Sequence, residues 1–139
     1  TDLAYVRVNS RISKIPIRIN SLTCNTALLT AIANDTDYEN IFSINLKRKG
    51  NSGDLVIVFS VSGKSPNIIN LVKVAKELEI ETFAIIGFDG GELLRMCDKS
   101  ILISSETGEY GPVEDIHLLI CHAVAELVKS SILSNLENK

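Results

Sequence analysis

Residues Gly53–Asn67, GDLVIVFSVSGKSPN, decide the fold of this chain. Leu55–Phe59 is an unbroken apolar run rich in β-branched residues, which is typical of a parallel strand covered on both faces. Ser65 followed by Pro66 is the pattern of an N-cap residue and a proline in the first helical position. The helix that follows, to about Leu78, carries its apolar residues at helical spacing. The stretch therefore predicts a strand, a tight loop and a helix in immediate succession.

The loop between that strand and that helix predicts an anion site. Ser60, Ser62 and Ser65 place three hydroxyl groups, and Lys64 one ammonium group, within a few residues of the helix start. A helix N-terminus presents unpaired backbone N–H groups and the positive end of the helix dipole, so a phosphate is a natural ligand. The loop has neither the Walker spacing nor the dinucleotide-binding glycine motif, so no nucleotide is expected. A polar turn that caps a helix, with nothing bound, is the competing interpretation.

Length and composition predict a single α/β domain with an aliphatic core. The chain has 139 residues, of which 45% are hydrophobic and only 5% aromatic, and this balance favours a parallel α/β fold over a β-sandwich. The net charge of −3 contains no long run of either sign, so neither nucleic-acid nor membrane-surface binding is expected. Three widely spaced cysteines predict free thiols in a reducing cytoplasm. No segment has the pattern of a transmembrane helix or a signal peptide.

Strand and helix patterns alternate along the chain. We expect strands at Ile15–Ile19, Leu55–Phe59, Thr82–Ile86 and Ser100–Ile103. We expect helices at Asp2–Ser10, Thr26–Ala33, Tyr38–Lys49, Pro66–Leu78, Glu92–Cys97 and Val113–Asn135, with a loop at Thr107–Pro112. The alternation predicts four parallel strands with helices on both faces, a three-layer α/β/α sandwich. Ligands of such folds lie at the carboxyl ends of the strands, which is where Ser60–Ser65 and Gly87–Gly91 fall. The last helix is apolar on more than one side, which predicts a subunit interface.

Candidate catalytic side chains lie in the last helix. Glu114 is near its start, and both histidines, His117 and His122, follow within it. Asp115 and Glu114 lie seven and eight residues before His122 and share roughly one side of the helix with it. Two helical turns span about 11 Å, so a carboxylate and the imidazole cannot touch, but both could reach a metal or substrate lying along the helix. A charged helix start with one exposed and one packed histidine explains the same residues without chemistry. The pair Asn34-Asp35, earlier in the chain, is by itself a helix stop.

Four segments together resemble sugar isomerase (SIS) domains, and within them the phosphoheptose isomerases. They are TALLTAIANDTDYENIFS, GDLVIVFSVSGKSPNII, GFDGGELLRMCD and VEDIHLLICHAVAEL. They are similar to the family's Asn-Asp segment between two helices, its serine-rich phosphate loop, its glycine-rich turn and its closing histidine helix. The resemblance covers essentially the whole chain. It implies one flavodoxin-like SIS domain over residues 1–139 that lacks the family's first helix, first strand and glycine-rich loop.

The resemblance also implies an activity and its residues. It implies a ketose–aldose isomerase that converts sedoheptulose 7-phosphate to a heptose 7-phosphate for cell-surface polysaccharide. The family is cytoplasmic and homo-oligomeric, as a tetramer or a dimer, and zinc is the candidate cofactor. By position against the family motifs, His122 and Asp2 are the expected catalytic residues, and Asp2, Glu114 and His122 the expected metal ligands. The residues expected to bind the phosphorylated sugar are Ser60, Val61, Ser62, Gly63, Lys64, Ser65, Asn34, Asp35 and Glu114.

Four substitutions distinguish the chain from the family pattern. Val61 stands where the family has a threonine, Glu114 where it has a glutamine, and Asp2 where it has a glutamate. Lys64 replaces an asparagine, which keeps or strengthens the affinity for anions. The substitutions support an alternative, a non-catalytic SIS module that binds a phosphosugar or a protein partner, as some relatives do for a DNA-replication initiator. A DNA-binding regulator is not expected, because the sequence shows no helix-turn-helix segment.

Overall fold

The computed structural model describes residues 19–137. The helix predicted at Asp2–Ser10 lies outside the described residues, as does the candidate catalytic residue Asp2. The elements in chain order are α1 (Thr26–Asp35), the 3₁₀ helix η1 (Tyr38–Asn40), α2 (Ile41–Lys49), β1 (Leu55–Ser60), α3 (Pro66–Glu77), β2 (Glu81–Gly87), α4 (Leu93–Met96), β3 (Lys99–Ile103) and α5 (Tyr110–Glu137). No helix within residues 19–137 is both long enough and apolar enough to cross a membrane.

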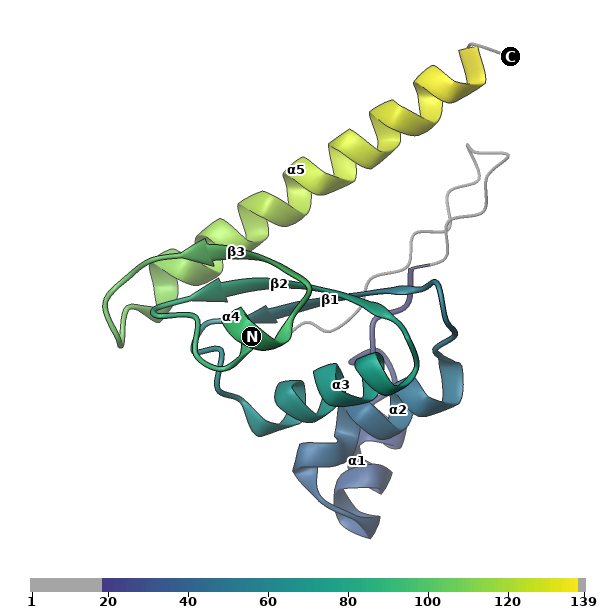
Figure 1. The fold of residues 1–139 in the computed structure, drawn as a ribbon, viewed down its shortest axis with the longest axis vertical. Helices are drawn as coiled ribbons and strands as arrows, with labels where there is room; N and C mark the ends of the chain where they lie inside the picture. The colour runs from purple at the N-terminus through teal and green to yellow at the C-terminus, as the bar shows by residue number, and fades with distance from the viewer. Residues whose placement is uncertain (1–18, 138–139) are drawn as a thin grey trace.

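The described strands form one parallel sheet in the order β1–β2–β3 (Figure 1). Because side chains alternate along a strand, Val56 and Val58 of β1 point to one face, and Phe59 points to the other. β2 repeats the pattern, with Ala84 packed on the first face. The parallel α/β architecture predicted from the sequence is therefore confirmed.

Helices lie on both faces of the sheet. Figure 1 shows α1, α2 and α3 on one side and the long helix α5 on the other. On the α3 side, apolar residues of α2, α3, β1 and β2 form one continuous aliphatic core, whose side chains include Leu46, Val56, Val58, Ile68, Leu71, Val72, Ala84 and Ile86. On the α5 side, a smaller cluster joins Val61, Phe88 and Val113, with Ile103 at its edge. The three layers α/β/α agree with the prediction.

Several element boundaries differ from those predicted, each for a local reason. α1 continues through Asn34 and Asp35, and it ends where the backbone N–H and the hydroxyl of Thr36 both donate to the carbonyl oxygen of Ile32 (2.9 and 2.8 Å). The helix predicted at Tyr38–Lys49 is divided, because its first turn is the 3₁₀ helix η1. α5 begins at Tyr110, inside the predicted loop, since a proline is tolerated in the first turn of a helix.

The sheet also differs from the predicted four strands, because the described residues contain three. The remaining expected strand, Ile15–Ile19, lies outside the described residues except for Ile19, which forms a single bridge. That strand stays a prediction.

Candidate substrate-binding site

The loop after β1 is folded by its own hydroxyl groups. The backbone N–H of Gly63 donates to Ser60 Oγ at 3.2 Å, and the backbone N–H of Lys64 donates to Ser62 Oγ at 3.2 Å. Ser60 is fully buried, and the side chain of Val61 packs with the small cluster under α5. Ser62 and Ser65 are partly exposed. The loop therefore turns Ser60 and Val61 inward and leaves Ser62, Lys64 and Ser65 at the surface.

The loop leads directly into the N-terminus of α3, as predicted. Ser65 is the N-cap residue with extended backbone and Pro66 is the first helical residue, yet the Ser65 side chain makes no capping hydrogen bond. The Ser65 carbonyl oxygen accepts the N–H groups of Ile68 and Ile69 (3.1 and 3.0 Å), which starts the helix. Asn67, which sequence reasoning missed, is buried and its Oδ1 accepts the Ile68 N–H at 2.9 Å. The Ser65 hydroxyl is therefore not used as a helix cap. It lies at the N-terminus of the 12-residue helix α3, which is the positive end of the helix dipole.

The glycine-rich loop after β2 lies directly against the serine loop. Gly63 and Gly91 both have positive φ angles (+63° and +54°), and a Cβ on Gly63 would lie 2.0 Å from the carbonyl oxygen of Gly90. The Gly63 carbonyl oxygen accepts the N–H groups of Glu92 and Leu93, at 3.0 and 3.2 Å. The prediction that these two loops share the carboxyl edge of the sheet is confirmed. Only glycine allows backbones to approach this closely.

A salt bridge joins the same two loops at the surface. Lys64 Nζ lies 3.1 Å from Asp89 Oδ2, and Asp89 Oδ1 accepts the N–H of Gly91 at 3.1 Å. The hydrogen bond from Lys64, followed by that from Gly91, holds the pKa of the Asp89 carboxyl below its ordinary value. Sequence reasoning missed Asp89, although an acidic residue in the loop after the next strand is the signal that could have found it.

Asn34 and Asp35 lie at the end of α1 and are exposed, with Asn34 Nδ2 donating to Asp35 Oδ1 at 3.0 Å. A cavity of about 330 Å³ is lined by Ala33 next to them and by Asn67 of α3. The cavity therefore connects the end of α1 with the first turn of α3. It is otherwise largely apolar, with residues of α1, η1 and α2 around it.

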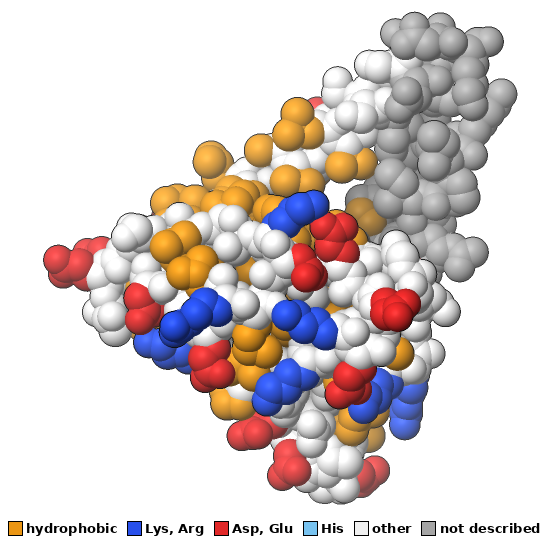
Figure 2. All heavy atoms as spheres, viewed as in Figure 1, with side chains coloured by type: hydrophobic (Ala, Val, Ile, Leu, Met, Phe, Trp, Pro, Cys, Tyr) orange, Lys and Arg blue, Asp and Glu red, His pale blue; other side chains and the backbone are white. Residues whose placement is uncertain are grey.

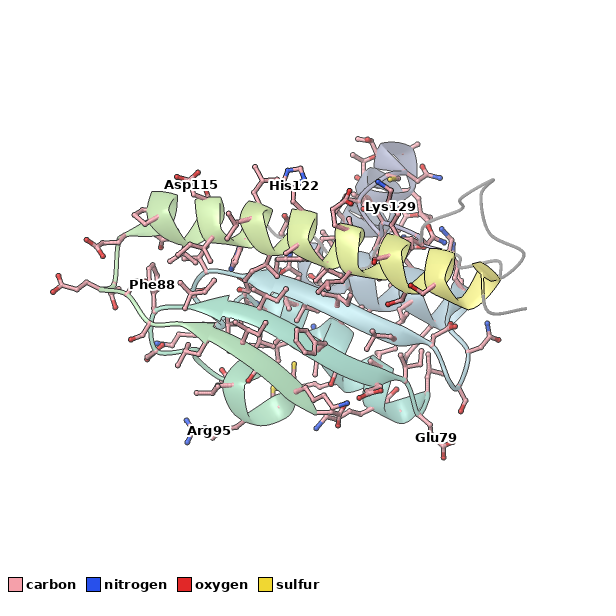
Figure 3. The ribbon with its side chains drawn as sticks, turned by 90° about the horizontal axis from the view of Figure 1, so that it is seen from above. Glu79, Phe88, Arg95, Asp115, His122 and Lys129 are labelled. Carbon is pink, nitrogen blue, oxygen red and sulfur yellow. The ribbon has the colours of Figure 1, made fainter. Side chains whose placement is uncertain are left out.

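The two histidines of α5 have opposite surroundings. His117 is 6% exposed and packs edge-on against Phe59, with ring centroids 5.5 Å apart. Its Nε2 has no hydrogen-bond partner among the described residues, and burial lowers the pKa of the imidazole. His122 is exposed, and Figure 3 shows it with Asp115 on the side of α5 that points away from the sheet. One histidine is therefore packed and the other exposed. The catalytic role of His122 stays a prediction.

The described residues do not by themselves fit a metal ion. Within residues 19–137, no three His, Cys, Asp or Glu side chains come close enough to hold one. Glu114 and His122 are eight residues apart, which is about 12 Å along a helix axis. The third expected ligand, Asp2, lies outside the described residues, so the predicted metal site stays a prediction.

Comparison with known proteins places the fold and the loops in a family. The family model of the SIS domain matches residues 2–87. The chain belongs to the SIS domain family. This assignment confirms the family resemblance of the serine loop, which lies within the matched residues.

Individual relatives carry a more specific name. The chain is 38% identical over 115 residues to the phosphoheptose isomerase of Sulfurimonas denitrificans, covering 83% of this chain and 58% of that protein. It is 39% identical over 112 residues to the phosphoheptose isomerase of Clostridium acetobutylicum, and the match covers 81% of this chain and 56% of that protein. The solved phosphoheptose isomerase of Neisseria gonorrhoeae superposes with a TM-score of 0.74 at 32% identity, over 81% of this chain and 62% of that one. The solved phosphoheptose isomerase of Francisella tularensis superposes with a TM-score of 0.78 at 29% sequence identity, over 83% of this chain and 63% of that one. The chain thus spans less than two thirds of the length of each of these relatives.

Proposed function

We propose that this protein is a sugar-phosphate isomerase that converts sedoheptulose 7-phosphate to a heptose 7-phosphate. The observation that carries the proposal is the serine loop at the carboxyl end of β1, which runs into the N-terminus of α3 with the Ser65 hydroxyl spare. The similarity to phosphoheptose isomerases supports the same activity. The product would enter cell-surface polysaccharide synthesis. The unpaired state of all three cysteines is consistent with the predicted cytoplasmic location.

The residues at the loop have distinct roles in this proposal. The hydroxyls of Ser62 and Ser65 hold the phosphate group at the positive end of the α3 dipole, and Lys64 supplies a positive charge. Ser60, Val61 and Gly63 shape the loop from inside, since the first two are buried and the third needs a positive φ. Asn34, Asp35 and Glu114 contact the rest of the sugar.

Isomerisation moves a proton between adjacent carbon atoms, so it needs a base and an acid beside the sugar. His122 and Asp2 are our candidates. Because His122 points away from the sheet whose edge carries the serine loop, it reaches a sugar held by a second copy of the chain more readily than one held by its own. We therefore propose a homo-oligomeric enzyme, a dimer or a tetramer.

The surface of α5 supports this oligomer. Leu118, Leu119 and Leu127 are all more than half exposed. Figure 2 shows hydrophobic side chains along α5 and the adjoining part of the sheet, whereas charged side chains gather over the opposite helices. A zinc ion, which the family resemblance implies, would need donors beyond Glu114 and His122 of one chain.

The decisive experiment is to incubate the full-length protein with sedoheptulose 7-phosphate in D₂O and to follow the sugar by NMR. Proton transfer through an enediol exchanges the proton at the reacting carbon, so an isomerase yields an aldose signal and incorporates deuterium. His122→Ala should abolish both effects while the thermal unfolding of the protein is unchanged. Full turnover by this variant would show that His122 is not the catalytic residue.

The second candidate function is a non-catalytic SIS module. One observation favours it, namely that the side chain of Val61 is buried among apolar residues and offers no hydroxyl to a substrate. Binding of the sugar phosphate without deuterium incorporation would support this alternative and contradict the isomerase.

A further inference from the structure

Lys64 is a cation within the serine loop, and its ammonium group already forms a salt bridge with Asp89. Its Nζ lies 3.1 Å from Asp89 Oδ2, in a pair whose side chains are 59% and 66% exposed. Exposed pairs of this kind are weak, because water screens them and two long side chains must be held in place. The pair can therefore be broken at small cost by a stronger partner.

A phosphate ester is such a partner. Lys64 lies between Ser62 and Ser65, the residues whose hydroxyls are at the surface of the loop. A phosphate held there carries up to two negative charges and three acceptor oxygens, whereas the carboxylate of Asp89 carries one charge. The same carboxylate also repels an approaching dianion.

Asp89 is the fixed member of the pair and Lys64 the movable one. Asp89 Oδ1 accepts the N–H of Gly91, whose backbone is in close contact with that of Gly63. Lys64 reaches the carboxylate through a flexible four-carbon side chain. An exchange of partners therefore moves the ammonium group and leaves the loop after β2 in place.

We propose that Lys64 changes partners when the site is filled, leaving Asp89 for the phosphate group, so that Asp89 is a positioning residue that sets the affinity for phosphate esters. This inference rests on the proposed function in placing the phosphate at the serine loop.

The test is a double-mutant cycle on the full-length protein with inorganic phosphate at pH 7.5, measured by calorimetry. Asp89→Asn should bind phosphate about threefold to tenfold more tightly, because it removes both the competing partner and the repulsion. Lys64→Ala should bind more weakly. In the Lys64→Ala background, Asp89→Asn should gain less than it does in the unmodified protein, because the competition no longer exists and only the repulsion is removed. Additive effects, or weaker binding by Asp89→Asn, would overturn the proposal, as would the lack of any binding by the unmodified protein at millimolar phosphate.

The chain offers a matched control, a second exposed salt bridge at the amino ends of the strands, far from the serine loop. Lys99 Nζ and Glu81 Oε1 lie 2.7 Å apart, with side chains 67% and 51% exposed, at the first residues of β3 and β2. Glu81→Gln changes the net charge as Asp89→Asn does and should leave phosphate affinity unchanged. An equal gain in both variants would mean that only overall charge matters, and the proposal would be wrong.

The pKa of the Asp89 carboxyl provides a second readout. Ligand binding would not change this pKa if Asp89 only stabilised the loop. Its pKa is held low in the free protein first by Lys64, so it should rise when Lys64 leaves. Carbon NMR of the Asp89 carboxyl with saturating sulfate, which stays a dianion at acidic pH, measures this change. An unchanged pKa would overturn the proposal. If Lys64→Ala and Asp89→Asn are non-additive in phosphate affinity but the protein does not isomerise the sugar, only the proposed function is refuted. If the protein isomerises the sugar but the two substitutions are additive, only the change of partner by Lys64 is refuted.

Discussion

The two faces of the sheet are covered to different extents by the same chain. On the α3 side, Val56, Val58 and Ala84 are completely buried under two layers of helix. On the α5 side, Leu55 and Ile101 remain 44% and 40% exposed beneath a single helix. A parallel sheet is normally buried on both faces. The comparison shows that a single chain fully buries the α3 face of the sheet and leaves apolar side chains of the α5 face exposed. This difference agrees with the proposed oligomer.

The largest effect should come from the closed face. Leu71 of α3 is fully buried, so Leu71→Ala should lower the free energy of unfolding by about 2–5 kcal/mol through lost burial and the cavity left behind. Leu119→Ala on α5, the same change at a side chain that is 67% exposed in a single chain, should cost less than about 0.5 kcal/mol at protein concentrations low enough to keep the chain monomeric. Urea unfolding of both variants measures the difference. Equal losses would mean that the two faces are not distinct.

The open face is tested by a charge at its apolar edge. Leu127 is 67% exposed on α5, and Leu127→Glu should weaken self-association by at least tenfold, since a carboxylate would be buried at the interface. Sedimentation velocity should then show a smaller particle. Ala31→Glu adds the same charge at an exposed position of α1, on the other side of the sheet, and should associate normally. A Leu127→Glu protein that keeps the mass of the unmodified protein would contradict an interface on α5.

The smallest effect concerns His117, the buried polar residue of the open face. Burial lowers its pKa, and the nearby Glu114 only partly opposes this shift. The unfolded chain therefore binds the proton first, so stability should fall as the pH drops below about 6.5, by up to about 1.4 kcal/mol per pH unit, until folded His117 is itself protonated. Above that range His117 contributes no pH dependence.

Unfolding at a series of pH values measures this slope. His117→Phe should flatten this slope below about pH 6.5. An unaltered slope in His117→Phe would assign the dependence to other groups.

The sequence predicted the centre of the molecule because the information there is local. The apolar run of β1, the N-cap at Ser65 and the proline after it each specify their own structure, and the structure confirms all three. The start of α5 and the division of η1 from α2 were missed, since tertiary packing decides between a loop and a first helical turn.

The site was predicted only in part for the same reason. The serine loop is contiguous in sequence, so its residues could be named from spacing alone. Asp89 could not, because its position beside Lys64 depends on β1 and β2 being neighbours in the sheet. The outward direction of His122 depends on which side of α5 meets the sheet, and that is fixed by the packing of Val113 and His117.

The back-to-back glycines at the mouth of the site have a mechanical consequence. With less than the width of a methyl group between the Gly63 and Gly90–Gly91 backbones, neither segment can move toward the other without pushing it. The hydrogen bonds from Glu92 and Leu93 to the Gly63 carbonyl oxygen resist their separation. A ligand that displaces the serine loop must therefore displace the turn after β2 by a similar amount. Backbone amide signals of both segments should then change together during a titration, at one and the same ligand concentration.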